Sequence, residues 1–307
     1  MIFFLTSFVV SVMASATPLL LAATGELVAE RSGVLNLGVE GMMLAGAVTG
    51  FVAGLMTGSA TVGLVAATLG GGALAAIFAV LTLTLLANQT AAGLALTIFG
   101  RGFSSLFGAA YVGLKGPVLP KLSIPGLSQL PFFGPTLFGQ DALVYGSFVI
   151  LAAVAWFLNR THGGLVLRAV GDSHDAAHAI GYGVIRIRFA ATLFGGAMAG
   201  LAGGYMSLAY SPLWAENMTA GRGWIALALV VFATWRAAWL LGGAYLFGSI
   251  MYLSLYVQGV GVPIPSALIS ALPYVVTVVV LAIISRDRRR IRLNQPACLG
   301  RSFAAGA

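Results

Sequence analysis

Long apolar stretches interrupted by very few charged residues constrain this chain more than any other feature. Of its 307 residues, 59% are hydrophobic and 8% are charged, whereas soluble domains carry roughly 25% charged residues. So few charges cannot cover the surface of a water-soluble protein of this size, so lipid must solvate most of it. The sequence therefore predicts an all-α, polytopic transmembrane helix bundle that forms one domain over residues 1–307.

A membrane-spanning helix needs about 20 predominantly apolar residues, and this rule predicts about nine spans (eight to ten). They are expected near 3–24, 38–57, 60–86, 90–110, 141–158, 187–209, 222–236, 238–258 and 265–285. The first stretch lacks a positively charged n-region and continues beyond Ala14-Ser15-Ala16. This favours an uncleaved first span over a cleaved signal peptide.

Arginine placement sets the expected orientation. Arginines gather in the loop 159–188 and in a basic tail, 286–307, and the positive-inside rule places both segments in the cytoplasm. Four spans separate the two segments, so the assignments agree, and the five spans before the loop put the N-terminus outside. Because both clusters flank apolar spans, they indicate topology, and we expect no nucleic-acid partner.

Glycines at intervals of four residues predict close contacts between spans, because they let helix backbones approach each other in lipid. The series in the second span is Gly46, Gly50, Gly54 and Gly58, and the series in the sixth is Gly196, Gly200 and Gly204.

The segment 25–43 carries three carboxylates, an arginine and several glycines between two apolar runs. One interpretation is an ordinary solvated loop. The other is a helix broken at membrane depth, as transporters use to build binding sites. Asn36 and Glu40 lie four residues apart with apolar neighbours on both sides, so we expect both to line a substrate pathway.

Polar and aromatic residues near other spans extend this expected pathway. Asn88 and Gln89 precede the fourth span, and Trp224 lies near the start of the seventh. Arg101 lies within the fourth span between two glycines, and its charge faces either a cavity or the membrane edge.

The loop 159–188 contains a short predicted helix that Asp172 or Ser173 would cap and Gly181 would end. Because two helical turns are not stable alone in water, a capped helix held between two spans is suited to docking a partner. The residues expected to make this contact are Asp172, Asp175, Ala176, Ala177 and Gly181.

His174 and His178 come close to the H-E-x-x-H zinc motif, with an aspartate in place of the glutamate. A catalytic zinc needs a third ligand and a general base, so we expect no metal. The chain also lacks the G-x-x-x-x-G-K-[ST] phosphate loop, so it does not bind ATP in that way. We expect no cofactor and no enzymatic activity in this chain.

Residues 17–41, which read TPLLLAATGELVAERSGVLNLGVEG, resemble the permease subunits of bacterial ABC importers for nucleosides and simple sugars. This family is related to the ribose and branched-chain amino-acid permeases. Residues 167–181 resemble its cytoplasmic coupling segment, with Ser173-His174 where an acidic residue and a proline are usual, and residues 218–223 resemble a further signature. Glu40 favours the nucleoside-type branch, because ribose-type permeases carry a serine there.

The resemblance implies a bacterial inner-membrane importer whose pore is formed by this chain and a non-identical sister permease. A cassette ATPase that binds ATP and Mg²⁺ would dock on the coupling loops, and an extracytoplasmic binding protein would deliver a nucleoside. A permease for ribose or another simple sugar is the alternative. An ion-coupled secondary transporter would explain the broken segment at Glu40 but not the capped helix, and a membrane metalloprotease rests on His174 and His178 alone.

Overall fold

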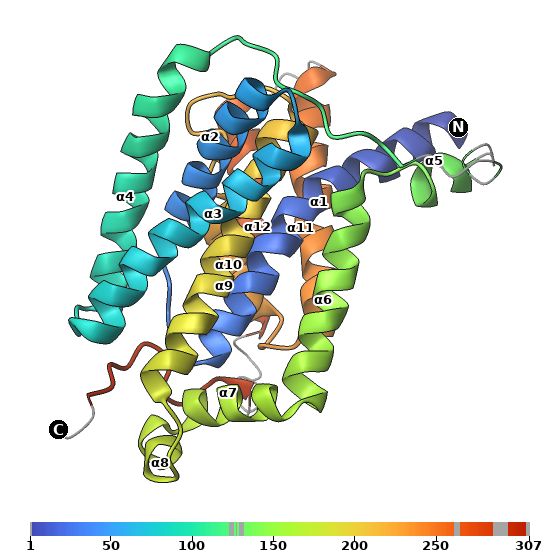
Figure 1. Ribbon diagram of the computed structural model, residues 1–307. Helices are drawn as coiled ribbons and strands as arrows, with labels where there is room; N and C mark the ends of the chain where they lie inside the picture. Colours follow the sequence, from blue (N-terminus) through green and yellow to red (C-terminus); the bar gives the residue numbers. More distant parts are fainter. Residues whose placement is uncertain are drawn as a thin grey trace.

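The computed structural model describes residues 2–122, 126, 128, 132–260, 265–284 and 294–304, and it shows a bundle of helices (Figure 1). The helices are α1 (Ile2–Arg31), α2 (Val39–Thr57), α3 (Ala60–Ala79), α4 (Gln89–Gly108), α5 (Phe133–Leu137), α6 (Ala142–Arg160), α7 (His162–Asp172), α8 (His174–Ala179), α9 (Val184–Tyr205), α10 (Arg222–Phe232), α11 (Ala237–Gly259) and α12 (Ser266–Ile284). Short π-helical turns extend α3 (Val80–Thr84) and α9 (Met206–Tyr210), and a 3-10 turn, Ala109–Tyr111, follows α4. The prediction of an all-helical membrane bundle is confirmed.

Among the described residues, six helices are long and apolar enough to cross a membrane, so the predicted count of nine full spans is not confirmed. They are α1, α2, α3 with its π-turn, α6, α9 with its π-turn, and α11. The largest difference is at the predicted span 222–236. With 11 residues, α10 is about 16 Å long, roughly half of the 30 Å hydrocarbon thickness. It ends at Phe232, before Thr234 and Trp235, which adopt positive φ angles of 47° and 53°.

Helix α9 packs against α1, α2 and α3 and so forms the centre of the bundle. Glycine makes this packing close: a Cβ atom on Gly46 would overlap the backbone of Gly200, and one on Gly50 would lie 2.9 Å from the Ala67 Cβ. A Cβ atom on Gly54 would lie 3.0 Å from the Leu208 Cδ2. Gly58 differs from its series, because it ends α2 at a left-handed φ of 68° and a Cβ added there would meet nothing within 4 Å.

Replacing Gly46 by alanine is expected to lower the melting temperature of the detergent-solubilised chain. The added methyl group must displace the α9 backbone, and overpacking of a tight core costs about 1–3 kcal/mol. Gly102→Ala is the control, because a Cβ there would meet nothing within 4 Å, and its melting temperature should not fall. Equal melting temperatures for Gly46→Ala and the unmodified chain would contradict the close α2–α9 contact.

Candidate functional site

The helical structure is interrupted between α1 and α2 by a break over residues 32–38. This break starts at Ser32, whereas the apolar pattern predicted a start near Gly25. Helix α1 continues to Arg31 and holds Glu26 and Glu30 at 1% and 0% exposure, so the carboxylates are not in a solvated loop. The chain then turns at Gly33, whose φ is 88°. In Figure 1 the segment after α1 rises along the bundle to the start of α2.

The start of α2 lies level with the middle of α4. The Thr97 hydroxyl donates a hydrogen bond to the Leu37 carbonyl oxygen at 2.9 Å, and a Cβ on Gly41 would lie 2.8 Å from the Thr97 Cα. Thr97 is close to the centre of α4, which runs from Gln89 to Gly108. The break therefore carries the chain from the end of α1 to about half the height of the bundle, where transporters place binding sites.

Glu40, just after this break, contacts a second non-helical segment, the one that precedes α10. Its Oε1 accepts hydrogen bonds from the Thr219 hydroxyl at 2.6 Å and the Gly221 amide at 2.8 Å, and its Oε2 accepts one from the Gly223 amide at 2.6 Å. The side chain is 4% exposed. The carboxylate thus satisfies amide groups at the start of α10, which have no partner within their own helix, and its charge suits the positive end of the helix dipole.

Helix α10 runs from this junction to the end of α1. The Trp235 carbonyl oxygen, just beyond α10, accepts a hydrogen bond from the Arg31 Nη2 at 2.7 Å. At the other end, Leu213 forms an isolated bridge with Lys115 in the loop that follows α4. The α9–α10 connection therefore returns from the far end of the bundle as a non-helical segment and becomes helical only at mid-depth.

Aromatic rings and one arginine surround the start of α10. The Arg222 guanidinium lies 5.6 Å from the centroid of the Tyr210 ring, and the Tyr274 hydroxyl donates to the Ala220 carbonyl oxygen at 2.7 Å. Trp224, which follows Gly223, is 46% exposed. The sequence pattern singled out Trp224 and residues 218–223, but it missed Tyr210 and Tyr274, whose positions depend on helices distant in sequence.

The remaining predicted pathway residues lie elsewhere. Asn36 is buried, and its Oδ1 accepts the Gly38 amide at 2.9 Å, which shapes the break. Asn88 caps α4 by accepting the Ala91 amide at 3.0 Å. Gln89 is buried and accepts the Leu35 amide at 2.8 Å. Arg101 is exposed on α4. Glu40 thus lies against the start of α10, the helix that carries Trp224. Asn36 lies near the start of α2, and Gln89 contacts the break at Leu35.

The predicted docking helix is present but shorter than expected. Figure 1 shows α7 lying across the ends of the long helices, followed by α8. Asp172 ends α7, and Ser173 caps α8 by accepting the Ala176 amide at 3.3 Å. Gly181 follows with a φ of 95°. Ala177 is 2% exposed, while the other predicted contact residues, Asp172, Asp175, Ala176 and Gly181, are exposed.

Residues 294–304, which we call the C-terminal strap, pack against this helix. This described part of the expected basic tail is therefore packed against α8. The tail's arginines at 286–292 lie outside the described residues. The Phe303 ring lies 5.2 Å from the His174 ring and 5.3 Å from the His178 ring, so the histidines of the zinc-like motif pack against an aromatic side chain. Burial lowers the pKa of His174, and the charge of Arg188 lowers that pKa further.

Arg188 links the strap to the break. It is 1% exposed, and its Nε donates to the Ser32 carbonyl oxygen at 3.1 Å and its Nη2 to that of Gly33 at 2.9 Å. Its Nη1 donates to the Arg301 carbonyl oxygen in the strap at 3.0 Å. Contacts therefore run without interruption from α8 through the strap to the start of the break, at Ser32 and Gly33. Nothing in the sequence pattern indicates this role of Arg188, which lies among the arginines that predict topology.

Comparisons with known proteins identify the family of this chain. Residues 8–281 match the family described as branched-chain amino acid transport system / permease component. A putative glucose ABC transporter permease protein of Haloferax volcanii is 38% identical over 94% of this chain and 94% of that protein. The guanosine ABC transporter permease protein of Bacillus subtilis is 30% identical, over 87% of this chain and 88% of that protein.

The nucleoside ABC transporter permease protein of Lactococcus lactis is also 30% identical, over 90% of this chain and 91% of that protein. No solved structure matches the chain. The family match covers most of the chain and agrees with the resemblance seen in residues 17–41 and 167–181. The chain is therefore a member of this family of ABC transporter permease components, a multi-pass membrane subunit that serves transport.

Proposed function

We propose that this chain forms half of the pore of an ATP-driven nucleoside importer in a bacterial inner membrane. A non-identical sister permease forms the other half, a cassette ATPase binds ATP and Mg²⁺, and an extracytoplasmic binding protein supplies the nucleoside. The observation that carries the proposal is the junction of Glu40 with the start of α10. Two broken segments meet there at mid-depth, where a permease can bind substrate.

The groups around this junction suit an uncharged, polar, aromatic substrate. Tyr210, Tyr274 and Trp224 offer ring faces on which a base can stack, and the Arg222 guanidinium supplies hydrogen-bond donors. Among the described residues, the Arg222 Nε is buried without a hydrogen-bond partner. The names of the relatives from Bacillus subtilis and Lactococcus lactis support a nucleoside. The name of the relative from Haloferax volcanii favours a sugar as the second candidate, because sugars also use aromatic faces and polar donors.

For topology, we propose nine crossings with the N-terminus outside and the strap in the cytoplasm. The seventh crossing consists of residues 211–221 and α10 together, and α4 and α12 complete the set. The start of α1 and the strap lie at opposite ends of the bundle, which supports an odd number (Figure 1). The loop 159–188, with α7 and α8, lies on the strap side, which fits its arginines.

For coupling, we propose that the cassette ATPase docks on α8 through Asp172, Asp175, Ala176 and Gly181. Movement of α8 then passes through Phe303 and the strap to Arg188 and the break, which moves Glu40 relative to α10. Asn36 and Gln89 hold the break on its cytoplasmic side, Asn88 holds the start of α4 there, and Glu40 and Trp224 lie at the substrate position.

The substrate proposal is tested by uptake into liposomes that hold the full complex. Labelled uridine should accumulate when ATP is supplied to the α8 side, and unlabelled adenosine should compete with it. Ribose and glucose should not compete at the same concentration. Uptake that glucose or ribose blocks and adenosine leaves unchanged would replace the nucleoside with a sugar.

Phe303→Ala is expected to uncouple ATP hydrolysis from uptake. The ring is 7% exposed, and loss of such a side chain costs about 3–5 kcal/mol of packing, enough to release the strap from α8. The number of uridine molecules taken up per ATP hydrolysed should fall several-fold in liposomes. Ser302→Ala, at an exposed neighbouring position, is the control and should keep the original ratio. An unchanged ratio in Phe303→Ala would show that the strap does not transmit the movement.

A further inference from the structure

A cavity separate from the Glu40 junction lies between α1, α6, α7 and α9. Its volume is about 780 Å³, and its lining includes Val28, Ile150, Phe157 and Phe194. The polar side chains in the lining are His162 and Tyr182, whose Nε2 and hydroxyl oxygen lie 3.5 Å apart. A polar substrate such as a nucleoside or a sugar would find too few hydrogen-bond partners there, so the cavity is not part of the proposed pathway.

The cavity lies at the end of the bundle that α7 crosses. On α6 its lining runs from Ile150 to Phe157, and on α9 from Ile187 to Phe194, which in both helices is the part nearest α7. Helix α7 supplies Val166 and Leu167 to the lining, and it lies across the ends of the long helices (Figure 1). With α7 at the membrane surface, an apolar space in this position lies level with the hydrocarbon of the adjacent leaflet, just inside its headgroup region.

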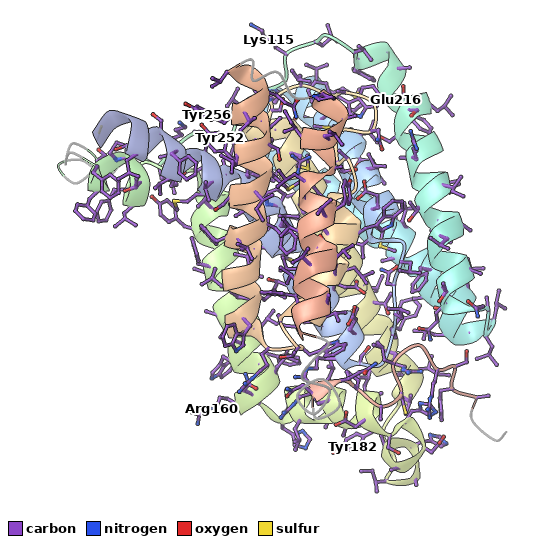
Figure 2. The ribbon with its side chains drawn as sticks, turned by 180° about the vertical axis from the view of Figure 1, so that it is seen from behind. Lys115, Arg160, Tyr182, Glu216, Tyr252 and Tyr256 are labelled. Atoms are coloured by element: carbon purple, nitrogen blue, oxygen red, sulfur yellow. The ribbon has the colours of Figure 1, made fainter. Side chains whose placement is uncertain are left out.

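Two exposed arginines adjoin lining residues of the cavity along the chain. Arg160 ends α6 two residues before His162, and Arg186 precedes Ile187 in the first turn of α9, and both are exposed. Figure 2 shows Arg160 and Tyr182 at the same end of the molecule. Among the lining residues no side chain is acidic. Arginines that follow or precede the lining residues of an apolar cavity complement a negatively charged headgroup attached to an acyl chain.

We propose that this cavity binds an anionic phospholipid of the leaflet on the α7 side. One acyl chain occupies the space between α6 and α9, and the headgroup phosphate contacts Arg160 and Arg186. The bound lipid fills the space between α6, α7 and α9 and so supports the helix that carries α8. This inference needs only the membrane position of α7 and does not depend on which substrate the pore carries.

The full-length chain, purified in nanodiscs made with equal amounts of phosphatidylglycerol and phosphatidylcholine of the same acyl chains, tests the proposal. Lipid that stays bound after transfer to detergent is measured by mass spectrometry. The unmodified chain should retain phosphatidylglycerol in preference to phosphatidylcholine. In Arg160→Gln and Arg186→Gln this preference should fall about five-fold for each arginine removed. Arg236→Gln, at an exposed arginine outside the lining, should retain it.

Ala153→Phe tests the acyl-chain position, because Ala153 lines the cavity while its exposed neighbour Ala152 does not. Ala153→Phe should lose both lipids, and Ala152→Phe should bind them as the unmodified chain does. Ala190→Phe repeats the test from α9 in case the first variant does not fold. Undiminished lipid in both filled variants would overturn the proposal. So would a loss of sister-permease binding in Ala153→Phe with bound lipid unchanged, since that outcome would assign the cavity to a protein interface.

Discussion

Glu40→Gln is expected to destabilise the α2–α10 junction and to abolish uptake. The glutamine amide keeps one acceptor oxygen but places an NH₂ group against a donor, the Gly223 amide that now lies 2.6 Å from Oε2. Hydrogen bonds to a charged group contribute about 1.5–3 kcal/mol, and a buried donor left without a partner costs about 1–3 kcal/mol. The start of α10 should therefore loosen and release Arg222 and Trp224 from the substrate position.

The measurement is uridine uptake by the full complex in liposomes, together with the melting temperature of the purified chain. Both should fall in Glu40→Gln. Glu216→Gln is the matched control, because Glu216 is exposed and accepts a single hydrogen bond from the Ser105 hydroxyl at 3.0 Å. If Glu40→Gln transported uridine as well as Glu216→Gln, the junction could not be the transport site.

Ala177→Pro is expected to abolish uptake while leaving the chain in the membrane. The Ala177 amide donates to the Ser173 carbonyl oxygen at 3.0 Å, and proline removes this bond and clashes with the preceding turn, at a cost of about 3 kcal/mol or more. Because α8 has only six residues, it cannot re-form around the substitution. Ala177 also packs with Val170, Val184 and Phe303, so the larger proline ring should disturb the contact between the helix and the strap as well.

Uptake and ATP hydrolysis by the complex are measured side by side, with membrane content determined by blotting of the membrane fraction. Ala177→Ser is the control, because it keeps the backbone amide and adds a single oxygen atom. Ala177→Pro should fail in uptake at normal membrane content, whereas Ala177→Ser should transport. Normal uptake by Ala177→Pro would refute the coupling role of α8.

The sequence predicts the parts of this structure that depend on local pattern. Scarce charge and long apolar runs require a membrane bundle, and the polar, glycine-containing segment 25–43 locates the break near Glu40. Ser173 and Gly181 mark a short helix because capping is a local interaction. The break itself starts later than predicted, because Glu26 and Glu30 are buried in α1, where carboxylates in a sequence usually indicate a solvated end.

The contacts between distant segments could not be predicted from one sequence. Glu40 accepts hydrogen bonds from Thr219, Gly221 and Gly223. No local pattern in either segment predicts that the two segments are in contact. The half-length of α10 also depends on this contact, since an apolar run at 222–236 is typical of an ordinary span. The strap was visible only as a basic tail, because its role comes from Phe303 and from backbone oxygens that accept from Arg188.

The dependence of uptake on ATP tests the central claim, that this chain is an ATP-driven pore, most directly. Labelled uridine is followed into liposomes that contain the complete complex, with ATP or a non-hydrolysable analogue on the α8 side and with or without an uncoupler. We predict that uridine accumulates with ATP, that the uncoupler does not change this accumulation, and that no uridine accumulates with the analogue. Accumulation that persists without ATP and collapses with the uncoupler would contradict the account and indicate an ion-coupled transporter.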